Sequence, residues 1–462
     1  MLQRLAGNQA VTSALEVQRY EAGEHAQFGA EAGTAERQFV LRLGSTQISS
    51  GVGDVQKYGD DPNVLVMSYG EAIALGDFYK DFDQLRQATQ SKESFSELRE
   101  LVRLVRKDVV AYTPGHPGTK PVTNEEFQQA TAGRKKEEQY VNLSAANAEH
   151  FDPPTTKLPD TAQKGDNKST WYGYHLAAIE KASAGKTDEA MLMNSFADHF
   201  LTDAFSAGHI VSKAELMEKA RAKVDKLAWH GYTWYKKLAF RSSVFTDRLA
   251  EDILADPEGA KLYGYQVNLG QAGAEWHEMS PQTLSPLIGA VMKQQADDIL
   301  SLFAKAVHDW LNEDIERRWG GLEVQNNLNP PWKLSGDGTL AASNETLTIA
   351  RQAVARSQQD ILDAAAFVKI GKAVNAPAMA DKVWDFVPHP TKKGQAKVDQ
   401  IVAELTDPER PETARAIAGI AVKNLPIMIN VLVNEKKRLR LKPAPAPATA
   451  PQHPVPTLVP SH

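Results

Sequence analysis

The sequence predicts a mainly α-helical protein, and three patterns lead to this prediction. Between residues 170 and 250 nearly every segment carries apolar side chains at helical spacing, as in TWYGYHLAAIEKASAG. Helical patterns at 286–318, 343–372 and 395–439 then alternate with short loops. Short β-branched runs with Gly and Asp turns, which are typical of strands, occupy residues 36–80. We therefore expect a mainly helical bundle with extensions at its N-terminal and C-terminal ends.

The other elements follow from the same kinds of pattern. Residues 1–20 have a loose amphipathic period, which predicts a short N-terminal helix. Residues 441–462 are rich in Pro and Ala and have no hydrophobic period, so we expect an extended or disordered tail. Between these ends, helices are expected at 71–88 and 91–110, and loops at 113–122 and 151–160.

Length and composition limit the classes of function. A chain of 462 residues can form one large helical domain with extensions, or two to three domains of ordinary size. Its 52 basic and 58 acidic residues give a net charge of −6, so no global positive field indicates nucleic-acid binding. The absence of cysteine excludes disulfides and thiolate metal sites, and it leaves His, Asp and Glu as the metal ligands.

The segment NSFADHFLTDAFSAGHI, residues 194–210, carries the most specific pattern in the chain. His199 and Asp203 are four residues apart, so on a helix they project from one face, close enough to share a metal ion. Gly208 can end or bend that helix, which would turn His209 back toward the same pocket. Imidazole and carboxylate groups suit zinc, and a carboxylate can bridge two ions. A buried helix with ordinarily hydrogen-bonded histidines is the alternative, and the triplet favours metal.

Three residues in the N-terminal half are further candidate ligands. His25 lies on an expected helix, four residues after Glu21, which is placed to orient its ring. His150 ends an Ala-rich turn. Asp77 is surrounded by apolar residues, where burial is costly without a cation, a hydrogen-bond network or exposure to solvent. An ordinary role competes with metal binding for each of them: a solvated His25, a capping His150 and an Asp77 at a helix end.

The remaining histidines divide into two kinds. His175 and His230 have aromatic neighbours in the sequence. We expect His175 to be packed or to support a ligand, whereas His230, which follows His209 by 21 residues, can close a site that His209 opens. The others have no convincing partners in the sequence, so a surface or loop position is expected for His116, His277, His308, His389, His453 and His462.

The spacing of His199, Asp203 and His209 resembles the central motif of the zinc-dependent phospholipase C family. That family shares an all-helical, trinuclear zinc fold with the fungal single-strand-specific zinc nucleases. The order of the candidates ahead of the motif, a histidine, an aspartate and a histidine, is also similar. The resemblance covers roughly residues 20–240. It implies a helical bundle of the phospholipase C type that hydrolyses phosphodiesters with one to three Zn²⁺ ions.

The resemblance also implies a ligand set. It implies one zinc among Asp77, His150, His199 and Asp203, a second at His209 and His230, and a third between Asp203 and His25. Asp77 is the implied catalytic residue, either as a ligand, as a base or as a group that orients water.

Three departures from the family pattern affect this ligand set. The family uses an N-terminal Trp as a ligand, whereas about twenty residues precede His25 and no Trp lies near it. Trp234 stands four residues after His230, where the family has a carboxylate. The family's Gln-Pro segment between Asp203 and His209 is replaced by AFSAG. The sequence therefore leaves open a trinuclear, binuclear, mononuclear or degenerate site.

The resemblance predicts a zinc-dependent phosphodiesterase that acts on phospholipid or on nucleic acid. A nuclease on the same fold is one alternative, and a non-catalytic structural or cargo protein with a degenerate metal site is another. The acidic net charge slightly favours lipid, as do the aromatic residues near the motif: Trp171, Tyr172, Phe196, Phe200, Phe205, Trp229 and Trp234.

The string LQRLAGNQAV, residues 2–11, resembles an N-terminal motif of proteins associated with extracellular contractile injection systems. This implies secretion as a toxin or effector without a Sec signal, with the injection particle as carrier; a chance helix in a cytoplasmic protein is the alternative. The sequence contains no run of about 18 apolar residues that would predict a transmembrane segment. The expected organisation is an export helix at 1–20, a metal-binding helical domain at 21–250, a helical continuation or second helical domain at 251–440, and a tail at 441–462.

Overall fold

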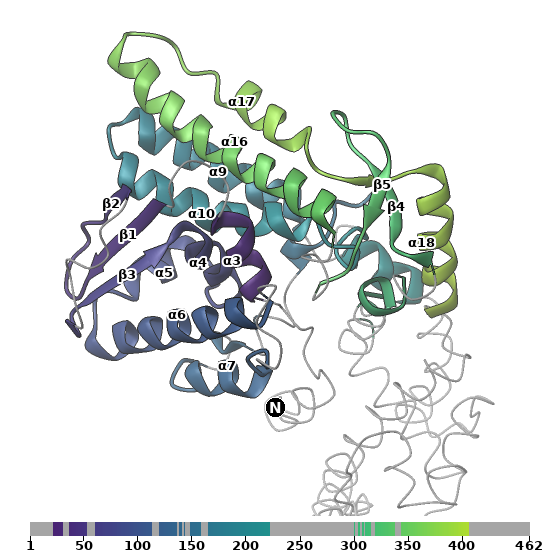
Figure 1. Cartoon of the computed structure of the whole chain (residues 1–462), viewed down its shortest axis with the longest axis horizontal. Helices are drawn as coiled ribbons and strands as arrows, with labels where there is room; N and C mark the ends of the chain where they lie inside the picture. The colour runs from purple at the N-terminus through teal and green to yellow at the C-terminus, as the bar shows by residue number, and fades with distance from the viewer. Residues whose placement is uncertain are drawn as a thin grey trace, which may run out of the picture.

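The computed structural model has a mainly helical fold, which confirms the fold class expected from the sequence (Figure 1). It describes residues 22–30, 37–52, 61–112, 120–135, 138–140, 143, 148–158, 165–221, 300, 304, 307–308, 310–315, 319–337 and 343–405. Within these ranges no helix is long and apolar enough to cross a membrane. The helix expected at 1–20, the tail expected at 441–462 and the candidate ligand His230 lie outside the described residues, so those expectations stay predictions.

A small sheet follows the first described helix, α3 (Ala22–Ala30). Its strands are antiparallel and lie in the order β2-β1-β3: β1 (Arg37–Arg42), β2 (Ser49–Val52) and β3 (Val64–Ser68). Burial alternates along β1, and Phe39 pairs with Met67 of β3 on the buried face. The strand pattern at 36–80 therefore ends at residue 68, where the helices begin.

The single helix expected at 71–88 is in fact three elements: α4 (Tyr69–Ala74), the 3₁₀ turn η2 (Leu75–Asp77) and α5 (Phe82–Gln87). Ser68 begins α4 through a capping box with Glu71, in which each side chain bonds the backbone N–H of the other residue. Asp81 begins α5 by accepting a hydrogen bond from Gln84 N. Because of this interruption, Asp77 lies in a short turn and not on the side of a long helix.

The body of the bundle consists of α6 (Lys92–Tyr112), α9 (Asn167–Ser183), α10 (Thr187–Asp203) and α16 (Asn344–Lys369). α9 and α10 form a helical hairpin that turns at Gly185, whose φ of 80° is in the left-handed region. α16 packs along both helices and also contacts α3 (Figure 1). Shorter elements surround this body: α7 (Asn124–Ala130), the 3₁₀ turn η4 (Ala148–His150), α17 (Ala376–Trp384) and α18 (Lys392–Leu405).

The C-terminal half contains a second small sheet, in the order β5-β4-β6: β4 (Leu322–Gln325), β5 (Trp332–Leu334) and β6 (His389–Pro390). A short π-helical turn, η8 (Trp310–Asp314), precedes it. The sequence NLNPPWKLSGDG, expected to be a loop, therefore contains a strand. Trp332 and Leu334 are buried and Lys333 is exposed, but three residues beside two prolines are too few to reveal this alternation.

A buried polar network joins α9, α10 and α16. Asp198 Oδ1 accepts hydrogen bonds from Trp171 Nε1 (3.1 Å) and from Ser357 Oγ (2.6 Å). Its other oxygen accepts one from Tyr69 Oη (2.8 Å). Burial raises the pKa of Asp198 to about 6, even though the hydrogen bonds favour its charged form. The packed position expected for His175 is confirmed, because its ring is fully buried and stacks on Trp171.

Asp108 attaches α3 to the rest of the bundle. One oxygen of its buried carboxylate accepts a hydrogen bond from Gly23 N (2.9 Å), and the other accepts one from Val122 N (2.7 Å). A Cβ atom on Gly23 would lie 2.7 Å from the carbonyl carbon of Asp108, so the glycine permits the close approach of α3 and α6. Since α3 carries His25, this attachment also positions a candidate ligand.

We expect Asp108→Asn to lower the free energy of unfolding by about 1–3 kcal/mol, because the amide has one acceptor oxygen and leaves one of the two backbone N–H groups without a partner. Urea denaturation followed by circular dichroism measures this loss. Asp83→Asn is the control, since the Asp83 side chain is 72% exposed and should tolerate the same change. Equal stabilities of the two variants would contradict the attachment.

Candidate metal centre

His199 and Asp203 lie together at the C-terminal end of α10, as their spacing predicts. Their side chains are fully buried, and His199 Nε2 lies 3.6 Å from Asp203 Oδ2. Neighbouring helices enclose this part of α10, so every residue from 194 to 203 is buried. The side chains of His199 and Asp203 can therefore form polar contacts only with other groups of the protein or with a bound ion.

The role expected for Gly208 is wrong in its detail. α10 ends at Asp203, five residues before the glycine, and the following turns bring His209 back toward the helix end. Gly208 is required for a different reason: a Cβ atom there would lie 2.5 Å from the side-chain amide of Asn312. Its backbone N–H donates a hydrogen bond to Asn312 Oδ1 (2.7 Å).

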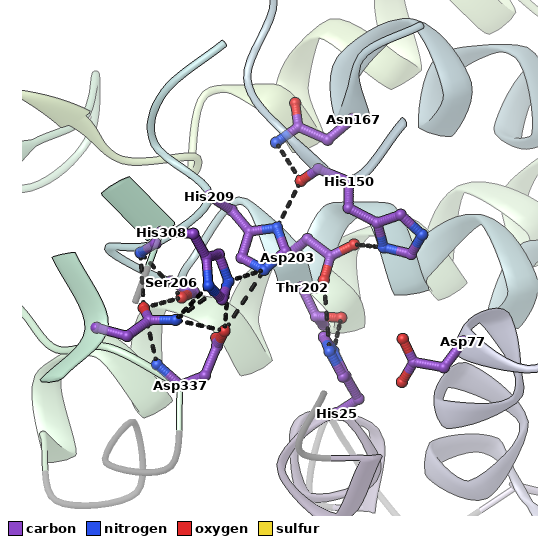
Figure 2. Close-up of polar contacts among 12 residues, drawn as sticks. His25, Asp77, His150, Asn167, Thr202, Asp203, Ser206, His209, His308 and Asp337 are labelled. Atoms are coloured by element: carbon purple, nitrogen blue, oxygen red, sulfur yellow. Dashed lines mark hydrogen bonds and ion pairs between the residues drawn. The ribbon is translucent and has the colours of Figure 1, made fainter. Parts of the chain in front are cut away.

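The three N-terminal candidates converge on the end of α10 (Figure 2). His25 Nε2 lies 3.4 Å from Asp203 Oδ1. His150 Nδ1 lies 2.8 Å from Asp203 Oδ2 and 3.1 Å from His199 Nε2. Asp77 Oδ1 lies 3.5 Å from His199 Nε2. Residues separated by up to 178 positions in the sequence therefore meet at one place.

His209 belongs to a separate cluster, which includes two residues that the sequence did not indicate. His308 was expected at the surface or in a loop, but it is buried, with its Nε2 3.2 Å from His209 Nε2. Asp337 completes the cluster, because its Oδ2 lies 3.2 Å from His308 Nε2 and 3.4 Å from His209 Nε2. His308 is therefore a neighbour of His209 that the sequence did not indicate, and the predicted role of His230 stays a prediction because that residue lies outside the described ranges.

A weak sequence signal for His308 exists. Asn312 follows it by four residues, and on a helical turn this spacing brings the two side chains together, with Asn312 Nδ2 3.1 Å from His308 Nε2. Because asparagine is not a charged ligand, the spacing of His308 and Asn312 does not indicate a metal site in the way that the spacing of His199 and Asp203 does. Asp337 lies in a Gly-containing loop, SGDG, where no spacing rule applies.

Hydrogen bonds fix the imidazole rings of His25 and His209. The single hydroxyl proton of Thr202 is donated to His199 O (2.8 Å), so His25 Nδ1 donates to Thr202 Oγ1 (2.8 Å) and the neutral ring has its lone pair on Nε2, toward Asp203. His209 Nδ1 donates to the carbonyl oxygen of His150 (2.8 Å), and Nε2 then faces the rest of its cluster. In both rings the atom that a metal would need is directed inward.

The spacing of these atoms matches that of ligands around one ion. Two ligand atoms at about 2.1 Å from a tetrahedral metal are about 3.4 Å apart. The corresponding separations here are 3.4 Å from His25 to Asp203, 3.5 Å from His199 to Asp77, and 3.2 Å from His308 to Asp337. Most are longer than good hydrogen bonds, which indicates room for a cation between the groups.

Three groups of donors result, and each could hold a metal ion. In each group the ligand atoms lie within 4.8 Å of one another: the first group is His25, His199 and Asp203, the second group is Asp77, His150 and His199, and the third group is His209, His308 and Asp337. The first and second groups share His199, and the two oxygens of Asp203 face His25 and His150 respectively. The Asp203 carboxylate therefore stands between these two groups, as a bridging ligand does.

Burial of these donors shifts their pKa values and leaves some of their polar atoms without a described protein partner. Neither carboxylate oxygen of Asp77 has a hydrogen-bond partner in the described structure, and burial raises the pKa of this residue well above its ordinary value. Burial also lowers the pKa of His199 well below its ordinary value. Burial would raise the pKa of Asp203, but nearby imidazoles, above all His199, outweigh it and lower that pKa. A cation among these residues would satisfy the orphaned atoms.

A pocket of about 680 Å³ opens beside the second group, whose Asp77 and His150 form part of its wall. The aromatic rings of Tyr174 and Phe200 are nearly parallel in this wall, at an interplanar angle of 7°. The rest of the wall consists of Gly76, Tyr79, Lys80, Asp81, Leu143, Glu149, Ser169, Thr170, Gly173, Ala177 and Met193. A molecule in this pocket would reach donors of the second group directly.

Comparison of the chain with models of known protein families, with curated proteins and with solved structures finds no match. Its function therefore has to be inferred from the residues of the site.

We expect Gly76→Ala to disturb the second group, because a Cβ atom at this position would overlap the ring of His199. The substitution has to move η2 away from α10, and it should lower the free energy of unfolding of the metal-free protein by about 1–3 kcal/mol. Chemical denaturation in the presence of a chelator measures the effect. At Gly133 a Cβ atom meets nothing within 4 Å, so Gly133→Ala is the matched control. If Gly76→Ala is no less stable than this control, the close packing is not required.

Proposed function

We propose that the protein is a zinc-dependent phosphodiester hydrolase of the phospholipase C type, secreted as an effector of a contractile injection system. The observation that carries this proposal is the position of the Asp203 carboxylate. It stands between two groups of histidine and aspartate donors, and the second of these groups borders a pocket. Two adjacent metal ions suit hydrolysis of a phosphate ester, because they can stabilise both the attacking and the leaving oxygen.

The donor set supports zinc as the metal. The three groups offer ring nitrogens and carboxylate oxygens, which zinc binds at short distance, and the chain has no cysteine. Their burial is less suitable for Mg²⁺ or Ca²⁺, which prefer oxygen ligands and water. Bound zinc would lower the pKa of a coordinated water toward neutrality and stabilise negative charge on the phosphate oxygens.

The residues of the chain have distinct roles in this proposal. Asp203 holds its two oxygens toward different imidazoles, so it would set the separation of the paired ions. Thr202 holds the ring of His25 with Nε2 directed inward. Asp77 and His150 belong to the second group and also line the pocket, so they are the donors nearest to a substrate. Asp77 remains the proposed catalytic residue, as a ligand, a base or a group that orients water.

The pocket favours phospholipid over nucleic acid as the substrate. Among the described residues that line it, Lys80 is the only lysine or arginine, against the acidic residues Asp77, Asp81 and Glu149. This excess of negative charge opposes a strand that carries one phosphate per nucleotide more strongly than a headgroup with a single phosphate. The parallel rings of Tyr174 and Phe200 are the one feature that favours a nuclease, since bases stack on aromatic side chains.

The experiment combines metal counting with activity. Purified protein should contain zinc by elemental analysis, hydrolyse phospholipid faster than single-stranded nucleic acid, and lose activity after treatment with EDTA. Asp203→Asn should reduce kcat by at least about 100-fold, because the proposed bridging charge is removed.

Asp381→Asn, a change of the same kind at an exposed position, should leave kcat unchanged. A metal-free protein without either activity would exclude the hydrolase and favour the non-catalytic cargo protein. Faster hydrolysis of single-stranded nucleic acid would favour the nuclease.

Secretion through an injection particle is supported by the sequence of residues 2–11 and not by the described structure. We expect deletion of these residues to remove the protein from purified injection particles, measured by co-sedimentation, without changing its hydrolysis of phospholipid in solution. Unchanged loading of the deletion variant would contradict the role of this segment.

A further inference from the structure

We propose that the corner between α16 and α17, residues 366–373, is a surface by which the protein docks on anionic lipid bilayers. This inference goes beyond the proposed function, because it concerns contact with the bilayer surface and does not depend on hydrolysis. The corner lies at the upper left edge of the bundle in Figure 1, where the chain leaves α16. It is also outside residues 20–240, the part of the chain that resembles the phospholipase C family.

The first observation is that apolar side chains at this corner face the solvent. Ile370 is 73% exposed and Val368 is 46% exposed. They are two of the four large apolar side chains that are exposed within the described ranges, and the other two, Val110 and Leu328, are distant from them in the sequence. A single exposed apolar side chain is ordinary, whereas neighbouring ones mark a surface that contacts another body.

The second observation is the charge around these side chains. Lys369 stands between Val368 and Ile370, and Lys372 follows them. Both lysines are exposed, and neither forms an ion pair with another described residue. No aspartate or glutamate occurs from residue 364 to residue 380. The corner therefore combines exposed apolar side chains with positive charge alone.

The third observation is that the backbone of the corner is a closed turn. Gly371 N donates a hydrogen bond to Val368 O (3.0 Å), and Lys372 N donates one to Phe367 O (2.8 Å). Gly371 has the left-handed φ of 69° that this way of ending a helix requires. Lys372 Nζ also lies 4.8 Å from the centre of the Phe367 ring. The exposed side chains are thus held in place, so binding does not require the corner to become ordered first.

This combination of groups fits the surface of an anionic bilayer. Aliphatic side chains gain free energy on entering the boundary between headgroups and acyl chains, while neighbouring lysines stay at the level of the lipid phosphates. The attraction of each lysine depends on negatively charged lipid and weakens with salt. A protein partner would need an apolar hollow with an acidic rim of matching shape, whereas a bilayer offers both over its whole surface. The contact is small, so docking should be reversible.

The test measures binding of the purified full chain to lipid vesicles, with release of soluble headgroup recorded in the same samples. We expect the protein to co-sediment with vesicles of phosphatidylserine and phosphatidylcholine. It should bind pure phosphatidylcholine vesicles at least about tenfold more weakly. Salt at about 0.5 M should release most of it from the anionic vesicles.

Two kinds of variant separate the apolar and the charged parts of the contact. Ile370→Ser should lower the partition coefficient on anionic vesicles at least about fivefold, because the apolar group that enters the bilayer is lost. Leu328→Ser is the matched control, since Leu328 is 55% exposed and lies in another part of the fold, and it should bind as the wild type does. Lys369→Gln combined with Lys372→Gln should weaken binding to anionic vesicles and leave binding to neutral ones unchanged.

The absence of cysteine from the chain allows the contact to be located. Ile370→Cys, labelled with an environment-sensitive fluorophore, should shift its emission to shorter wavelength when anionic vesicles are added. Leu328→Cys with the same label should show no shift. Equal shifts at both positions would show that the protein binds without using this corner.

Other results would also overturn the proposal. One is Ile370→Ser that binds anionic vesicles as tightly as the wild type. Another is a wild type that forms dimers in analytical ultracentrifugation and does not bind vesicles, with Ile370→Ser monomeric, since the corner would then join two copies of the chain. Vesicle binding without release of headgroup supports the docking surface and counts against the hydrolase. Hydrolysis of a soluble short-chain phospholipid without vesicle binding does the reverse.

Discussion

The carboxylate of Asp203 is the group on which the rest of the site depends. It is completely buried at the end of a helix that is itself enclosed, so its charge has to be stabilised by polar neighbours inside the protein. Those neighbours are the imidazoles of His25, His150 and His199, which come from three different elements. The packing of α3 and η4 against α10 can therefore be understood as the means by which a buried negative charge is surrounded. The same arrangement gives metal ions their ligands.

Much of the fold and the centre of the site could be predicted from the sequence. Helical periodicity gave the long helices, and the four-residue spacing of His199 and Asp203 placed both on one face of α10. Asp77 was expected to need a cation, a network or solvent, and it is buried with no hydrogen-bond partner in the described structure. The long helices and the shared face of His199 and Asp203 could be predicted because both depend on local helical geometry, whereas the cation expected at Asp77 stays a prediction.

The predictions that were wrong concern features set by contacts between residues far apart in the sequence. His308 was expected at the surface because nothing near it in the sequence resembles a ligand pair, and its partner Asp337 lies in a loop. Gly208 was interpreted as a helix end, although its absent side chain makes room for Asn312, more than a hundred residues away. The strand at Trp332–Leu334 is too short to show a period. Such contacts between distant segments leave no trace in local sequence patterns.

The polar network around Asp198 has a consequence for α10 itself. Asp198 and His199 are consecutive, so one ridge of the helix is held by Trp171 and Ser357 while the adjacent ridge supplies the donors of the metal groups. A helix turns by about 100° per residue. Inserting or deleting one residue in this part of α10 would therefore rotate either the partners of Asp198 or the metal donors out of position. The length of α10 is thus constrained both by the hydrogen-bond network of Asp198 and by the position of the metal donors. Variation in size among related chains should be confined to the connections at its two ends.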